Sequence, residues 1–264
     1  MNETCRNCQH EVVANFCGNC GQKKHKRIDG KYIKDEMQYV LIHTNKGLFY
    51  SIKKIMRAPG TTALEFIHGN RVNHYKPILL VFLLAGISAF ITNAFIHPLE
   101  VQQKFNEMQN VKSTFADGFS ASFMKYQAIF MLLSVPFAAI FSWISFKKWG
   151  LNYCEHVIAN SYFYAATLIF SITVTLPIQY FLRESPMLFV MIPSVLSLFS
   201  MFGIGIWFFV QLYPDKPTGP IILRLILTFV LMFGTIMVLA LGGTLLYLLL
   251  NPEVLETMKA AQPK

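Results

Sequence analysis

The chain has few charged residues for its length, since Asp, Glu, Lys and Arg make up only 14% of its 264 residues. Hydrophobic residues make up 54%, and the 24 Phe outnumber the 14 acidic residues. An ordinary soluble domain needs more polar surface than this composition can supply. The composition therefore excludes an ordinary soluble domain and indicates a membrane protein.

Sequence motifs of common enzymes are also missing. The chain contains no HExxH helix, no Ser-His-Asp order and no Gly-rich loop that could hold a phosphate. His68 and His74, six residues apart across Gly69, form no such motif. Ionisable residues inside a membrane span would mark a pathway or an active site. The apolar stretches of this chain hold almost none. We therefore expect the protein not to be an enzyme.

An apolar run is absent from residues 1–30, so we expect no secretory signal peptide and a reducing, cytoplasmic environment for the first cysteines. These cysteines form two CxxC pairs separated by eight residues: Cys5, Cys8, Cys17 and Cys20. Two such pairs can complete a tetrahedral sulfur shell, so the spacing predicts a structural Zn²⁺ site. Two disulfides are the alternative. His10 lies between the pairs and could replace one sulfur, although four already suffice.

Residues 1–30 are thus expected to form a small zinc-ribbon-like module followed by a basic linker. Gly18 and Gly21 suit such a module, because a chain that wraps a metal needs positive φ angles. The basic run at 23–27 could contact phosphates of lipid headgroups, which are the nearest ones. Nucleic acid is a lesser alternative partner for this run, and a solvated linker is the plainest interpretation.

Residues 31–76 are predicted to form cytoplasmic amphipathic helices. Over 32–57, apolar residues recur at steps of three and four with Lys between them, with a break near 45–47, and a short helix follows from 61. The basic amphipathic segment could lie in the membrane interface or pack against the underside of the bundle. Its candidate residues for binding lipid or a protein partner are Lys53, Lys54, Arg57, Arg71 and Lys76.

Five apolar stretches are long enough to cross a bilayer, which predicts an all-α membrane protein. Pro77 begins the first at a position where a missing N–H costs nothing. The expected spans are about 77–97, 126–146, 157–182, 187–212 and 221–250, followed by a polar tail at 251–264. Residues 1–76 carry 13 Lys and Arg against 6 acids. The positive-inside rule therefore predicts a cytoplasmic N-terminus, and five spans place the C-terminus on the opposite side. We expect the protein to lie in the cell (inner) membrane.

Polar residues near or inside the spans give two further hypotheses. Glu155 and His156, at the mouth of the third span, could pair with Lys147 or Lys148 or bind a ligand. Prolines within three spans, Pro136, Pro177 and Pro193, are expected to kink them, and transporters place sites at broken helices. Uncharged Asn93, Asn160 and Gln179 could line such a site or simply join helices.

The order of these features resembles a known family. The CxxC pairs and amphipathic segment are followed by RAPG at 57–60, EFIHGNRVNHYKP at 65–77 and LNYCEH at 151–156. This arrangement is similar, over essentially the whole chain, to the bacterial domain-of-unknown-function family 3667. The resemblance implies a multi-pass membrane protein with a zinc-ribbon-like start, and it implies no activity.

Two functional hypotheses remain. The first is a non-enzymatic platform whose zinc-binding head and basic interfacial helix engage a protein partner or anionic lipid. The second is a small transporter or channel built around the proline-containing spans. A platform predicts a dry bundle with a cationic underside, whereas a transporter predicts a polar cavity at mid-depth lined by Asn93, Asn160 or Gln179.

Overall fold

The computed structural model describes residues 3–5, 8–21, 44–71, 74–109, 122 and 124–250. The predicted basic run at 23–27, the first part of the predicted amphipathic segment at 32–43 and the tail at 251–264 lie outside the described residues. The chain divides into two compact units, Met1–Gly47 and Leu48–Lys264, and each is described by itself.

The first unit contains a two-stranded antiparallel sheet. Strand β1 (Glu3–Thr4) pairs with β2 (Glu11–Val12), so that Glu3 lies opposite Val12. Its buried hydrophobic cluster consists of Cys5, Val12 and Cys17, with Cys8 packed against them. Three buried residues, among those that the structure describes in this unit, give very little hydrophobic stabilisation, so this module depends on its cysteines.

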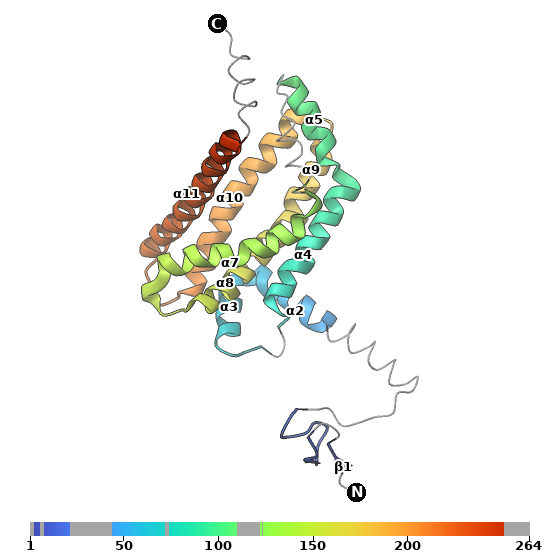
Figure 1. The fold of residues 1–264 in the computed structure, drawn as a ribbon, viewed down its shortest axis with the longest axis vertical. Coiled ribbons are helices and arrows are strands. Elements are labelled where there is room, and N and C mark those ends of the chain that lie inside the picture. The colour runs from blue at the N-terminus through green and yellow to red at the C-terminus, as the bar shows by residue number, and fades with distance from the viewer. Residues whose placement is uncertain are drawn as a thin grey trace. The chain divides into compact units, whose positions relative to one another are not determined.

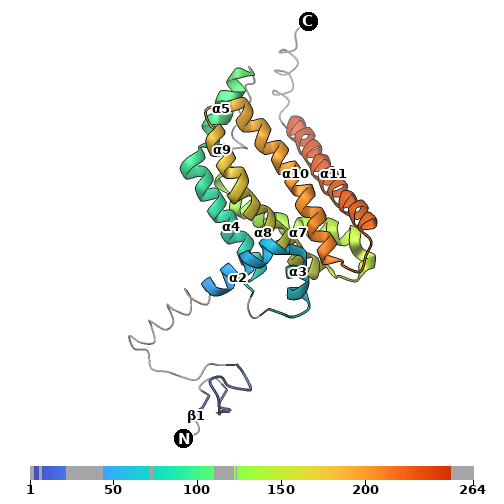
Figure 2. The same ribbon diagram turned by 180° about the vertical axis from the view of Figure 1, so that it is seen from behind.

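The second unit is a helical bundle, and its described residues include five helices long and apolar enough to cross a membrane, which confirms the predicted fold class (Figures 1 and 2). The candidate spans are Pro77–Ile96, Gln127–Trp149, Tyr153–Leu182, Pro186–Leu212 and Thr218–Leu245. They are built from α4 (Pro77–Ile91) with η2 (Thr92–Ile96), α7 (Gln127–Phe146) with η3 (Lys147–Trp149), α8 (Tyr153–Phe170) with η4 (Ser171–Thr175) and α9 (Leu176–Leu182), α10 (Pro186–Leu212) and α11 (Thr218–Leu250).

Local chemistry explains two details of the third span. It begins at Tyr153, before the predicted 157, because Asn152 and Glu155 form a reciprocal capping box: the Asn152 side chain accepts from the Glu155 N–H, and the Glu155 carboxylate accepts from the Asn152 N–H. Pro177 follows a π-helical turn, Ser171–Thr175. Such a turn is a common way for a helix to accommodate the N–H that proline lacks.

Two short helices, α2 (Thr44–Arg57) and α3 (Pro59–Ile67), lie at one end of the bundle, and α5 (Pro98–Met108) lies at the other (Figures 1 and 2). Ile55 of α2 and Ala63 of α3 belong to the same buried cluster as residues of α4, α7, α8, α10 and α11. Ile55 is 1% exposed. Of the two locations that the sequence left open for the amphipathic segment, its described part therefore packs against the bundle.

The contact between α3 and α10 depends on the missing side chain of Gly60. A Cβ there would lie 2.0 Å from the Phe208 carbonyl oxygen and 2.8 Å from the Leu212 nitrogen, and these backbone atoms cannot move aside. The Gln211 side-chain oxygen accepts hydrogen bonds from the Gly60 N–H (3.0 Å) and the Thr61 N–H (3.4 Å). These bonds satisfy N-terminal donors of α3 that have no partner within their own helix. A residue of α10 thus caps α3, and only glycine fits at the contact.

Candidate functional site

The four cysteines of the two CxxC pairs come together in one cluster. Their sulfur atoms all lie within 4.8 Å of one another. The Cys5 and Cys20 sulfurs are 3.6 Å apart, as are those of Cys8 and Cys17. A disulfide would need about 2.05 Å, so the cysteines are free thiols rather than two disulfides. Cys5, Cys8, Cys17 and Cys20 can therefore supply four ligands to one metal ion, and His10 is not part of this set.

The two CxxC pairs adopt matching backbone turns. The Gln9 N–H donates to the Cys5 carbonyl at 2.8 Å, and the Gly21 N–H donates to the Cys17 carbonyl at 2.9 Å. Gln9 has φ 62° and Gly21 has φ 74°, so each turn ends in a left-handed residue directly after its second cysteine. Gly18, expected to share this geometry, does not take a positive φ. Sequence reasoning missed Gln9 because only glycine signals this conformation.

The candidate cations differ in what they contact. Lys53 and Arg57 are exposed on α2, where they share a face with exposed Phe49 and Met56, and Lys76 is exposed immediately before α4. We call Phe49, Lys53, Met56 and Arg57 the α2 outer face. Helical spacing places these four residues together, since they recur at steps of four and three. The α2 outer face therefore combines apolar side chains with positive charge.

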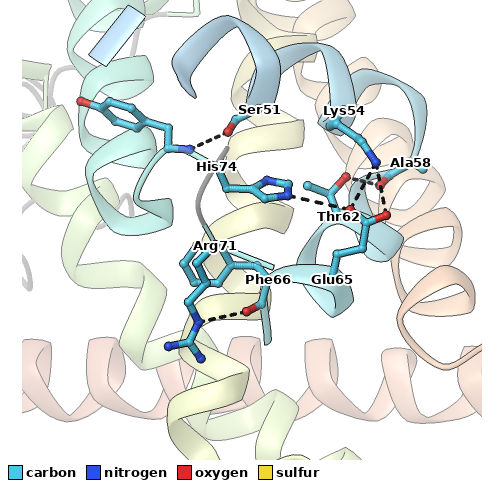
Figure 3. Close-up of polar contacts among 9 residues, drawn as sticks. Ser51, Lys54, Ala58, Thr62, Glu65, Phe66, Arg71 and His74 are labelled. Atoms are coloured by element: carbon cyan, nitrogen blue, oxygen red, sulfur yellow. Dashed lines mark hydrogen bonds and ion pairs between the residues drawn. The ribbon is translucent and has the colours of Figure 1, made fainter. Parts of the chain in front are cut away.

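Lys54 and Arg71 instead fasten parts of the chain together (Figure 3). The Lys54 ammonium lies 3.2 Å from both carboxylate oxygens of Glu65 and thereby joins α2 to α3. The Arg71 Nε donates to the Phe66 carbonyl at 3.2 Å, and its guanidinium lies 5.5 Å from the Phe66 ring. Of the predicted binding cations, these two have partners within the fold.

Glu155 and His156 are neighbours in sequence, but their side chains contact different parts of the structure. Glu155 caps its own helix, as described above. His156 is fully buried, with Nδ1 3.0 Å from the Ser142 hydroxyl and Nε2 3.4 Å from the Tyr213 hydroxyl. Asn160 donates to the same Ser142 hydroxyl at 2.7 Å. His156 therefore joins α7, α8 and the end of α10 within the bundle, and the structure does not bring it together with Glu155 as one site.

His74 lies near Glu65 and Thr62 at the end of the helical unit that holds α2 and α3 (Figure 3). Its side chain is 0% exposed, and its ring packs edge-to-face against Tyr50, Phe66 and Tyr162 at centroid distances of 5.2, 6.1 and 6.4 Å. Its Nε2 lies 3.8 Å from a Glu65 carboxylate oxygen, too far for a hydrogen bond. Among the described residues, neither ring nitrogen has a hydrogen-bond partner. The sequence shows no enzyme motif around His74, and the burial of His74 among these rings was not predicted.

Burial makes the neutral form of this imidazole the stable one. Desolvation lowers the pKa of His74 below 6.5, the Glu65 carboxylate opposes that shift, and the Lys54 ammonium adds to it. The surrounding backbone is held by the Tyr75 N–H, which donates to the Ser51 hydroxyl of α2 at 2.8 Å. His74 is thus a neutral side chain enclosed between α2, α3 and α8.

Comparison with known proteins gives one result. Residues 45–89 match the model of a family described as Protein of unknown function (DUF3667). The resemblance expected from the sequence is confirmed over this DUF3667 segment, which is shorter than the whole chain. No curated protein and no solved structure gives a significant match.

The DUF3667 segment coincides with the part of the structure just described. It runs through α2 and α3, the loop that carries Arg71 and His74, and most of α4. It also contains Gly60, whose contact seats α3 on α10. The matched residues therefore form the layer at one end of the bundle together with the first span.

We predict that His74 makes the protein less stable in mild acid. The unfolded chain binds a proton at the ordinary pKa of 6.5, whereas the folded chain does so only at a lower pH, so stability falls as the pH drops below about 6.5. His74→Phe removes this titration and should flatten the fall of Tm between pH 7 and pH 5 in detergent. Exposed His68 is the control, and His68→Phe should keep the wild-type slope. Equal slopes for all three proteins would contradict the assignment.

Proposed function

We propose that the protein is a non-enzymatic membrane platform, whose zinc-binding head and basic surface engage a protein partner or anionic lipid. The observation that carries this proposal is the distribution of charge between the two ends of the helical unit. We call the end that holds α2 and α3 the basic end (Figures 1 and 2).

Among the described residues of the helical unit, which are 48–71, 74–109, 122 and 124–250, the excess positive charge lies at the basic end alone. There, nine Lys and Arg face three acids, namely Lys53, Lys54, Arg57, Arg71, Lys76, Lys147, Lys148, Lys216 and Arg224 against Glu65, Glu155 and Asp215. The opposite end carries Lys104, Lys125 and Arg183 against Glu100, Glu107 and Glu184. One end thus carries six net positive charges and the other end none among the described residues.

This asymmetry favours a basic end that faces the cytoplasm, because Lys and Arg near span ends stay on that side. With five spans, the N-terminal module is then cytoplasmic and the C-terminus lies across the cell (inner) membrane. Anionic headgroups of the cytoplasmic leaflet attract a surface of this kind. The α2 outer face suits the same interface, since Phe49 and Met56 can enter it while Lys53 and Arg57 remain at phosphate level.

Zinc is the metal that we propose for the four-cysteine cluster. Four sulfurs placed about 2.3 Å from one tetrahedral Zn²⁺ lie about 3.8 Å from each other. Two of the six observed separations are 3.6 Å, close to that value, and all six are at most 4.8 Å. Because the module buries so few side chains, metal binding would supply most of its folding free energy. The role of the ion in this proposal is structural.

A small transporter or channel is the second candidate. It is favoured by a cavity of about 280 Å³ inside the bundle, which Asn160 lines. The other two amides lie elsewhere: Asn93 is exposed and donates to the Ala89 carbonyl, and Gln179 is not among the cavity-lining residues. The platform is therefore the better supported of the two proposals.

We predict one zinc ion per purified chain. Replacing Cys5 and Cys20 together with Ser removes two of the four sulfur ligands and should abolish the zinc content measured by elemental mass spectrometry. Cys154→Ser is the control, because Cys154 lies outside the cluster and should leave the stoichiometry at one. Wild-type protein that is free of zinc after purification without chelators would reject the assignment.

The platform is tested by removing three positive charges from the basic end or, as a control, from the opposite end. The triple variant Lys53→Gln, Arg57→Gln, Lys76→Gln should lose its preference for anionic over zwitterionic phospholipid, measured by native mass spectrometry of lipids that remain bound after release from mixed nanodiscs. The control variant Lys104→Gln, Lys125→Gln, Arg183→Gln removes the same charge from the opposite end and should keep that preference. Higher salt should weaken the preference of the wild type for anionic phospholipid, because salt screens the charges. An equal preference in both variants would contradict the lipid-binding surface.

A further inference from the structure

The cavity in the bundle extends along the spans. Residues of α4, α7, α8, α10 and α11 line its volume of about 280 Å³. Its α10 wall extends from Ser197 to Phe209, which is about 18 Å at the helical rise per residue. Half of a bilayer's hydrocarbon core is about 15 Å thick, so the cavity has the length of one leaflet's acyl chain.

The exposed wall of the cavity is mostly apolar, although half of its lining residues carry a hydroxyl or amide group. The hydroxyls of Thr167, Ser200 and Thr228 each donate to a carbonyl of their own helix, at 2.9 Å in all three cases. Asn160 donates to the Ser142 hydroxyl at 2.7 Å and to the His156 carbonyl at 2.8 Å. The other polar lining residues are Ser88, Gln127, Tyr164, Ser171, Thr175 and Ser197, and the apolar ones include Phe163 and Met232. Water stays in a buried site only where it finds several polar partners. An apolar occupant fits this wall better.

Packed aromatic rings lie beside the cavity at its Phe209 wall. Phe209, which lines it, stacks on Phe146 at 4.8 Å, and Phe146 stacks on Tyr213 at 5.2 Å. Trp149 packs edge-to-face against both Phe146 and Tyr213, at 5.3 and 5.0 Å. These rings add apolar surface next to the cavity.

Towards the bilayer the cavity is bordered by the two least buried spans. The most apolar windows of α10 and α11 are 11% and 17% buried, against 28–39% for the other three. Ser197 both lines the cavity and is exposed. The cavity therefore meets the surface that faces lipid chains.

We propose that this cavity binds one acyl chain of a membrane phospholipid. Its length, its mostly apolar wall and its lipid-facing border fit a single alkyl chain. The proposal is independent of the platform function, because the lining of the cavity includes none of the basic surface residues and none of the clustered cysteines.

The test uses the full-length protein in nanodiscs that contain phosphatidylcholine with a diazirine in the middle of one acyl chain. After illumination, mass spectrometry should find adducts on the cavity residues Met201 and Met232. Thr228→Phe fills the cavity and should abolish the Met232 adduct. Thr244→Phe is the matched control on α11, since exposed Thr244 makes the same kind of hydroxyl-to-carbonyl bond within the helix.

The positions of the diazirine adducts on the wild-type protein keep the test decisive even if a variant folds poorly. Ser200→Phe offers a second way to fill the cavity. Adducts confined to lipid-facing residues such as Phe199 and Val230 would overturn the proposal. The same diazirine on a free fatty acid forms the second arm. Labelling of Met232 by the fatty acid but not by the phospholipid would also overturn it, because the occupant would then be a free acid.

Discussion

The arrangement of the helical unit depends on one backbone contact, that of Gly60 with α10. The Gly60 Cα faces the Phe208 carbonyl where no side chain could fit, and Gln211 caps the first N–H groups of α3. A helix N-terminus is polar, and at the end of a membrane bundle it needs a partner. Here the fourth span provides that partner, so the end of α10 and the start of α3 form a single structural unit.

The position of α3 on α10 determines which charged residues can form contacts with each other. Because Glu65 is held on α3, it can pair with Lys54 of α2 and face the buried ring of His74. Those contacts orient α2 so that Ser51 and Ile55 point inwards and the α2 outer face points away from the bundle. Removing an internal partner such as Glu65 would leave polar groups without compensation, which is costly. The packing of α3 on α10 therefore determines both which charged residues pair inside this end and which remain exposed on the α2 outer face.

The coarse architecture could be predicted because it follows from one strong physical requirement. Backbone polar groups in lipid must bond within their own helix, so apolar stretches near twenty residues long identified all five candidate spans. The cysteine cluster was equally accessible, because CxxC spacing restricts the possible chemistry. In contrast, the pairing of Lys54 with Glu65, the separation of His156 from Glu155 and the burial of His74 depend on contacts between distant helices. Sequence periodicity shows which residues share a face, but not what that face meets.

Hydrogen–deuterium exchange of the protein in nanodiscs tests the docked α2–α3 layer most directly. The account predicts that amides of 48–67 are protected in the wild type and lose that protection in Gly60→Val, because the added side chain meets the α10 backbone. Gly86→Val, at a helical position with open space around it, should leave 48–67 protected. Rapid exchange of 48–67 in the wild type, or protection that Gly60→Val leaves unchanged, would contradict the account.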